Sequence, residues 1–180
     1  DVLIRRAREE LRTTQPLRVR DQLAKLAPTV LLHFSGGRNT AYQANMWFKP
    51  LERLSTPAIV LFRERHHMAE FESTTLPLVY VDATRDLELI VPDSVKVSLY
   101  AANVGKNLHW LRTQTCKHVF IGHGDSDKAG SAHNLMKVYD HMLVAGQAHI
   151  ERMESAGLKM PEGYYIKVGR PQLELFFGKV

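Results

Sequence analysis

Short apolar runs alternate with helix-like polar segments along most of the chain. The run TVLLHFS at 29–35 is almost continuously apolar, which is typical of a strand covered on both faces of a sheet. Similar runs recur at regular intervals, and the segments between them have helical periodicity. The predicted strands are 29–35, 57–63, 76–82, 95–103, 117–123, 139–146 and 164–171, and the predicted helices are 41–54, 65–73, 105–113 and 147–157, with a short helix after residue 82.

Strands that alternate with helices at this spacing predict βαβ units, whose strands are parallel and whose crossovers are right-handed. The predicted fold class is therefore α/β, a doubly wound, mostly parallel sheet of six or seven strands with helices on both faces. Thr40 is expected to cap the first helix after residue 29, and Gly157 to end the helix 147–157. There is no internal repeat, so residues 29–171 are predicted to form one Rossmann-like domain.

The composition fits a globular protein. The 180 residues are 44% apolar and 24% charged, and no apolar run reaches the length of about 20 residues that a membrane helix needs. The single cysteine, Cys116, rules out an internal disulfide and is expected to be a small buried hydrophobe. A catalytic thiol is the less favoured interpretation.

The net charge is +5 and the pI is about 9.4, which favours phosphates or an anionic membrane face as partners. Nucleic acid is not a predicted partner. Segment 1–28 is predicted to be an amphipathic basic helix broken at Pro16. The favoured interpretation is a solvated helical face, and peripheral attachment to anionic lipid is the second. The expected location is cytoplasmic, and under the second interpretation the protein is also peripheral on the inner face of the plasma membrane. The basic residues of this segment are Arg5, Arg6, Arg8, Arg12, Arg18, Arg20 and Lys25.

Loops that follow strands are the candidate sites, because doubly wound sheets bind ligands beyond the carboxyl ends of their strands. The first such loop lies in HFSGGRNT, where backbone amides at a helix N-terminus can accept an anion. It matches neither G-x-G-x-x-G nor the P-loop, and a tight turn that needs glycine is an equally favoured interpretation. The candidate substrate-binding residues of this loop are Ser35, Gly36, Gly37 and Arg38.

The strongest candidate is VFIGHGDSDK, where a buried strand runs into a dense polar turn. A neutral imidazole is the usual side chain for taking a proton near neutral pH, so His123 is the predicted general base. Asp125 or Asp127 is expected to orient the imidazole, and Lys128 to pair with a phosphate. The alternative is a satisfied polar turn. The candidate substrate-binding residues here are Gly124, Asp125, Ser126 and Lys128.

A pair of histidines, His66 and His67, invites a metal interpretation. His66 and Glu70 stand four residues apart on one helical face, with Glu64 nearby. There is no H-E-x-x-H motif, however, and a third ligand is not evident. We therefore expect surface histidines and no metal bound by protein side chains alone.

Three segments carry a family resemblance: VFIGHGDSDK, YDHMLVAGQAHIERM and YIKVGRPQLE. Together they resemble the CDP-glycerol glycerophosphotransferases of teichoic-acid and capsule biosynthesis, which have two Rossmann-like halves in the GT-B arrangement. By this resemblance, His123 matches the histidine taken as catalytic base. Asp140 opens the matching later strand, and residues 169–171 match the turn between the halves.

The resemblance implies an enzyme that transfers a glycerol-phosphate-like unit from a CDP-activated polyol donor to a hydroxyl acceptor, in the family a lipid-linked polymer. No cofactor is expected. The chain resembles the N-terminal, acceptor-side half alone, with 172–180 beginning a linker to a nucleotide-binding half, so it is expected to be inactive by itself. One alternative is another GT-B sugar-nucleotide glycosyltransferase or epimerase. Another is a non-enzymatic, flavodoxin-like nucleotide-binding or regulatory module.

Overall fold

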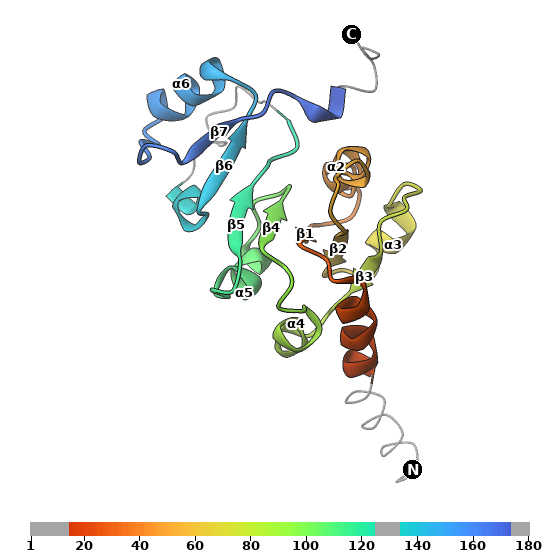
Figure 1. The fold of residues 1–180 in the computed structure, drawn as a ribbon. Coiled ribbons are helices and arrows are strands. Elements are labelled where there is room, and N and C mark those ends of the chain that lie inside the picture. The colour runs from red at the N-terminus through yellow and green to blue at the C-terminus, as the bar shows by residue number, and fades with distance from the viewer. Residues whose placement is uncertain (1–14, 125–133, 174–180) are drawn as a thin grey trace, which may run out of the picture.

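The computed structural model describes residues 15–124 and 134–173, which fold around one sheet of seven parallel strands (Figure 1). The strand order is β3-β2-β1-β4-β5-β6-β7. Every neighbouring pair is parallel, which confirms the predicted doubly wound α/β fold. The strands are β1 (Val30–Phe34), β2 (Ala58–Phe62), β3 (Leu78–Tyr80), β4 (Val97–Tyr100), β5 (Lys117–Phe120), β6 (His141–Val144) and β7 (Tyr165–Lys167).

The strand order reverses once, between β1 and β4. The chain winds outward from β1 to β3, returns to place β4 beside β1, and winds outward again to β7. An order of 3-2-1-4-5-6 is that of dinucleotide-binding folds, whereas flavodoxin-like sheets have the order 2-1-3-4-5. The flavodoxin-like alternative is therefore wrong as a description of this sheet. The reversal marks the place where such folds bind their ligands.

Helices cover both faces of the sheet (Figure 1). None of the helices in the described part of the chain is long and apolar enough to cross a membrane. A helix over 15–26 precedes β1. The other helices are α2 (Tyr42–Glu52), α3 (His67–Glu70), α4 (Thr84–Ile90), α5 (Leu108–Leu111) and α6 (Gln147–Ser155), and the 3-10 helices are η1 (Gly105–Asn107), η3 (Asn134–Val138) and η4 (Pro171–Leu173).

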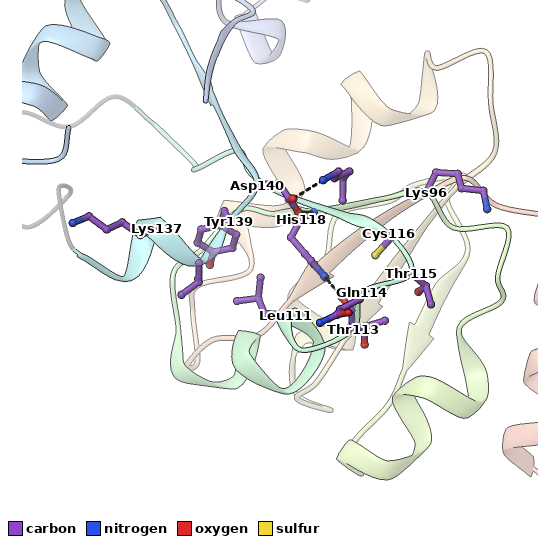
Figure 2. Close-up of a pocket in the computed structure, with 12 residues that line it drawn as sticks. Lys96, Leu111, Thr113, Gln114, Thr115, Cys116, His118, Lys137, Tyr139 and Asp140 are labelled. Atoms are coloured by element: carbon purple, nitrogen blue, oxygen red, sulfur yellow. Dashed lines mark hydrogen bonds and ion pairs between the residues drawn. The ribbon is translucent and has the colours of Figure 1, made fainter. Parts of the chain in front are cut away.

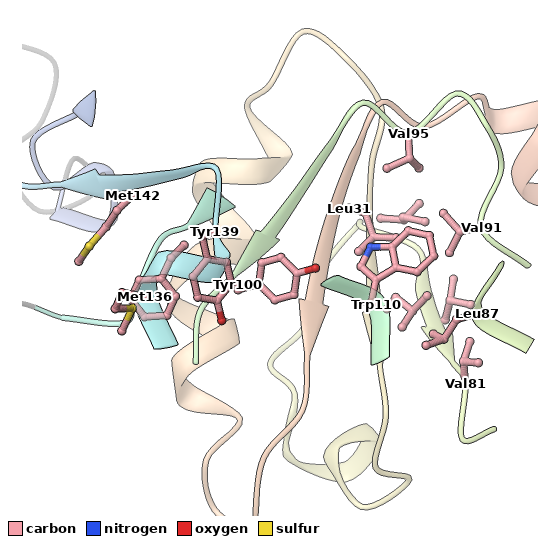
Figure 3. Close-up of a cluster of buried hydrophobic side chains, with 14 of the residues drawn as sticks. Leu31, Val81, Leu87, Val91, Val95, Tyr100, Trp110, Met136, Tyr139 and Met142 are labelled. Atoms are coloured by element: carbon pink, nitrogen blue, oxygen red, sulfur yellow. The ribbon is translucent and has the colours of Figure 1, made fainter. Parts of the chain in front are cut away.

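The core has two layers, one on each face of the sheet. In β2, Ile59 and Leu61 belong to one apolar cluster and Val60 and Phe62 to the other, as the period of two along a strand requires. All five residues of β2 are buried. The first cluster packs α4 and α5 onto the sheet, and Trp110 lies at its centre among aliphatic side chains (Figure 3). Burial on both faces explains why the strands read as continuous apolar runs.

Helix α6 ends as its sequence predicts. Gly157 has a φ of +90°, its N–H donates to Glu154 O at 2.9 Å, and the next N–H, of Leu158, donates to Met153 O at 2.9 Å. These two bonds form the Schellman motif, in which glycine takes the left-handed position. The capping prediction for Thr40 is wrong. Thr40 Oγ1 donates to the Gly37 carbonyl, and α2 begins without a side-chain cap.

The helix predicted at 65–73 is only one turn long, His67–Glu70. Asn45 of α2 ends it: its Nδ2 donates to Glu70 O at 3.2 Å, and its Oδ1 accepts the Glu72 N–H at 3.2 Å. Phe71 has extended backbone and its ring packs among aromatic rings, with the Phe62 centroid 5.1 Å away. Burial of this ring and the bonds from Asn45 outweigh the helical periodicity of the local sequence.

The basic N-terminal segment is described only from residue 15, so residues 1–14 lie outside the described residues. Pro16 is buried near the start of the described helix 15–26, so the predicted break there stays a prediction. Leu23 is also buried in the first core cluster, with Val19 packed against it. This helix is therefore attached to the sheet domain through one apolar face.

Candidate active site

The carboxyl ends of β1, β2, β4 and β5 bring together loops from distant parts of the sequence. Ser35–Arg38 follow β1, and His123 and Gly124 follow β5. These six predicted site residues therefore lie at one edge of the sheet, close to the reversal of strand order. Asp125, Ser126 and Lys128 lie outside the described residues.

The turn after β1 is held by a carboxylate from the loop after β2. Ser35 Oγ donates to Glu64 Oε1 at 2.8 Å, and the Gly36 N–H donates to Glu64 Oε2 at 3.2 Å. A Cβ on Gly36 would collide with Thr40 Oγ1, so a larger residue there would require the Thr40 side chain to move. The Glu64 carboxylate thus occupies donors that the sequence interpretation assigned to a substrate anion. Arg38 is exposed at the tip of the same turn.

Glu64 is also bonded to a cation from the loop after β4. Lys106 Nζ lies 2.8 Å from Glu64 Oε1, and its side chain is about half exposed. Partial burial by itself raises the pKa of Glu64, but the hydrogen bonds from Lys106, Ser35 and Gly36 outweigh burial and lower that pKa. A fixed negative charge with a solvent-accessible cation beside it therefore lies at the reversal of strand order.

His123 is held in one orientation by the loop after β4. Its Nδ1 lies 2.9 Å from the Ala101 carbonyl oxygen. A carbonyl only accepts hydrogen bonds, so Nδ1 carries the proton in the neutral ring and Nε2 keeps its lone pair. The Tyr42 ring meets the imidazole edge to face, with centroids 6.0 Å apart. The imidazole is partly exposed, so Nε2 is the nitrogen with which it can accept a proton from a ligand.

The backbone before His123 explains one of the two flanking glycines. Gly122 has a φ of +61°, a conformation that other residues rarely adopt. Its carbonyl accepts a hydrogen bond from Trp47 Nε1 of α2 at 2.6 Å. The left-handed turn therefore sets the direction in which His123 leaves β5, and α2 holds that turn in place.

A small hollow lies at the same edge, next to the residue that follows His123. Gly124 lines it together with Trp47, and with Gly169 and Arg170, which follow β7. The segment after β7 returns across the sheet, and η4 packs against α2. Two of the sequence segments that carry the family resemblance, around residues 123 and 169, thus meet in space.

Two charged residues of this edge, Arg63 and Lys106, were not singled out in the sequence. Arg63 is buried and donates to the carbonyl oxygens of Val81 and Asp82, at 2.7 Å each. Burial lowers the pKa of its guanidinium, while Glu64 and Asp82 oppose that effect. Arg63 ties the ends of β2 and β3 together. The position of Arg63 directly after a strand could have marked it as a residue of this edge. The local sequence does not show, however, that its partners are backbone carbonyls.

The expectation of surface histidines is wrong for His67, which is fully buried. The His67 ring packs against Phe34, with centroids 4.8 Å apart. Its Nε2 lies 3.1 Å from the Gly37 carbonyl oxygen, on the turn after β1. His67 is buried because α3 is short and the chain turns inward at Phe71, which a longer helix would prevent.

Another hollow, of about 590 Å³, lies at the opposite edge of the sheet (Figure 2). Its lining includes Lys117 and Asp140, at the amino ends of β5 and β6. Lys117 Nζ bonds to Asp140 Oδ1 at 2.8 Å, and the His118 N–H bonds to Asp140 Oδ2 at 2.8 Å. These polar groups join neighbouring strands. Because ligands of such sheets bind at the carboxyl ends, we assign the candidate active site to the edge with His123.

The sequence and structure comparisons give few relatives. No model of a protein family matches the chain, and no curated protein matches it. Two solved structures of the wall teichoic acid polymerase TagF are similar to it, each with 13% sequence identity. A histidine-to-alanine variant aligns over 96% of this chain and 47% of the polymerase chain, with a TM-score of 0.51. A histidine-to-asparagine variant soaked with CDPG aligns over 94% and 46%, with a TM-score of 0.50.

This likeness shows the fold. At 13% identity it identifies no residue of the site and no substrate. The chain spans about half the length of the polymerase chains that it matches. The site geometry therefore has to support a function from the residues of this chain.

Proposed function

We propose that the chain is the acceptor-side half of a transferase that moves a glycerol-phosphate-like unit from a CDP-activated donor to a hydroxyl acceptor. The observation that carries the proposal is the orientation of His123. The Ala101 carbonyl holds its Nδ1–H at 2.9 Å, so Nε2 keeps the lone pair that can accept a proton at the ligand-binding edge of the sheet.

The sequence resemblance supports the same assignment. The segment around His123 and the segment around Gly169 both resemble the CDP-glycerol glycerophosphotransferases, and both line one hollow. The fold is also that of the polymerase TagF over nearly the whole chain. These observations support the family from two independent directions, the motif residues and the sheet topology.

In the proposed reaction, Nε2 of His123 takes the proton of the acceptor hydroxyl as its oxygen attacks the β-phosphate of the donor. The new bond joins that oxygen to the phosphorus carrying the polyol, and the bond from this phosphorus to CMP breaks. CMP leaves with the electron pair. Positioning and charge neutralisation supply most of the rate in such transfers. Arg38, which is exposed at the same edge, is the candidate for a phosphate contact.

Two partners complete the proposal. The CDP-activated donor is held mainly by a second half of the enzyme, and this chain supplies the acceptor side with its base. The acceptor is a hydroxyl group at the end of a lipid-linked polymer, so the protein works at the inner face of the membrane. The exposed basic residues Arg18, Arg20 and Lys25 on the helix 15–26 support attachment to anionic lipid.

The replacement His123→Asn tests the role of the base in the full-length protein that contains this chain. The asparagine amide can still donate a hydrogen bond to Ala101 O, but it has no basic nitrogen. We expect CMP release from CDP-glycerol to fall about a hundredfold or more, because a positioned general base contributes about 10²–10⁴. The melting temperature should stay unchanged.

His141→Asn is the matched control. His141 Nδ1 also bonds to a carbonyl, Gly163 O at 3.1 Å, but His141 begins β6 at the opposite edge of the sheet. This variant should keep normal turnover. Near-normal turnover by His123→Asn, with an intact thermal transition, would show that the histidine is only part of a turn.

A further inference from the structure

Three donors of the kind that bind transition metals gather at α3, outside the machinery described above. One donor atom each from His66, His67 and Glu70 lies within 4.8 Å of the other two. His66 directly precedes the helix, and its ring lies 4.2 Å from the His67 ring, centroid to centroid. His67 is fully buried, and His66 and Glu70 are partly buried. The cluster is therefore largely withdrawn from water.

The two nitrogens of His67 have different surroundings. Nε2 lies 3.1 Å from Gly37 O, so it carries the proton of a neutral ring. Nδ1 is buried without a hydrogen-bond partner, and it lies 3.7 Å from Glu64 Oε2. A neutral ring thus keeps a buried lone pair at Nδ1 that no hydrogen-bond donor satisfies.

The distance from His67 Nδ1 to Glu64 is too long for a hydrogen bond. At 3.7 Å it exceeds the range of about 2.7–3.2 Å for an N–H···O hydrogen bond. Metal-binding histidines also donate their other N–H to a carbonyl or carboxylate, as His67 does to Gly37.

His66 and Glu70 also have features that suit a metal ligand. Nε2 of His66 is buried and has no hydrogen-bond partner, which is unfavourable for a polar atom unless it binds something. Glu70 is oriented by the backbone of the turn after β1, because its Oε2 accepts the Asn39 N–H at 3.1 Å. Each residue of the cluster therefore has either an unsatisfied nitrogen or an oriented carboxylate.

We propose that His66, His67 through Nδ1, and Glu70 bind a divalent transition metal ion of the zinc class. Two imidazoles and one carboxylate form an established zinc ligand set, with water in the fourth position, and imidazole does not favour Mg²⁺ or Ca²⁺. The negative charge of Glu64 beside the ion adds to its affinity. The ion joins α3 to the turn after β1, because the ligands also bond to Gly37 and Asn39.

Zinc binding by the purified protein tests this proposal. After dialysis against ZnCl₂ and then buffer, elemental analysis should find about one zinc per chain, and competition with a chromophoric chelator gives the affinity. Glu70→Gln keeps an oxygen that accepts the Asn39 N–H but removes the charge, and His66→Ala removes one nitrogen. Each should weaken zinc binding at least about tenfold. Zinc should raise the melting temperature of the wild type more than that of either variant.

Two controls separate this site from general histidine binding. His141→Ala removes a partly exposed histidine elsewhere and should leave the zinc affinity unchanged, and MgCl₂ should not displace zinc. Less than half an equivalent of zinc in the folded wild type would overturn the proposal. Unchanged affinity in both His66→Ala and Glu70→Gln, or an equal loss in His141→Ala, would overturn it as well.

Discussion

At the scale of single residues, His33 shows how the core restricts protonation. It lies in the middle of β1, fully buried, with its ring 5.4 Å from the Tyr100 ring. Burial, and then the positive charge of Arg63, lowers the pKa of His33 from 6.5 to about 3. The unfolded chain binds a proton there below about pH 6.5, while the folded chain stays neutral. Folding stability is therefore lost as the pH falls from 6.5 towards 3.

The first prediction follows from this difference in pKa. When the pH is lowered from 7.5 to 5, protonation of His33 in the unfolded chain should lower the free energy of unfolding by about 2 kcal/mol. One pKa unit corresponds to about 1.4 kcal/mol. His33→Leu should abolish that part of the acid sensitivity. Urea unfolding of both proteins at the two pH values measures it. An equal loss of stability in the wild type and the variant would contradict the burial argument.

At the scale of elements, the helix 15–26 combines two different faces. Leu23 is buried against the sheet domain, whereas Leu17 and Leu26 are 46% and 38% exposed. Arg18, Arg20 and Lys25 are also exposed. A helix with exposed leucines and basic residues suits the interface of an anionic membrane. The face with Leu23 packs against the sheet domain. The exposed face is therefore the one available for contact with a membrane.

We therefore predict that the protein sediments with vesicles that contain phosphatidylserine and not with vesicles of phosphatidylcholine alone. Arg18→Glu combined with Arg20→Glu should abolish binding, and salt should weaken it steeply. Surface attraction is screened over about 8 Å at physiological ionic strength. Binding that does not change with salt, or that is equal on both kinds of vesicle, would count against the proposed attachment.

At the scale of the whole molecule, the sequence predicts the sheet well because the strands stand out as apolar runs, and β1 and β2 in its interior are buried on both faces. The carboxyl edge and the position of His123 follow from that layout. The bonds that complete the site were not predictable from local patterns. Glu64 bonds to Ser35, 29 residues away, and Lys106 bonds to Glu64 across 42 residues. The burial of His67 depends on Asn45 and Phe71, which the period of the local sequence does not reveal.

The most direct test of the proposed function is CMP release from CDP-glycerol, followed by chromatography. The full-length protein should release CMP in the presence of a hydroxyl acceptor, and it should release no UDP from UDP-glucose under the same conditions. The 180 residues alone should release no CMP, because in the proposed enzyme a second half holds most of the donor. Release of UDP but not CMP, or CMP release by the 180 residues alone at the rate of the full-length protein, would contradict the account.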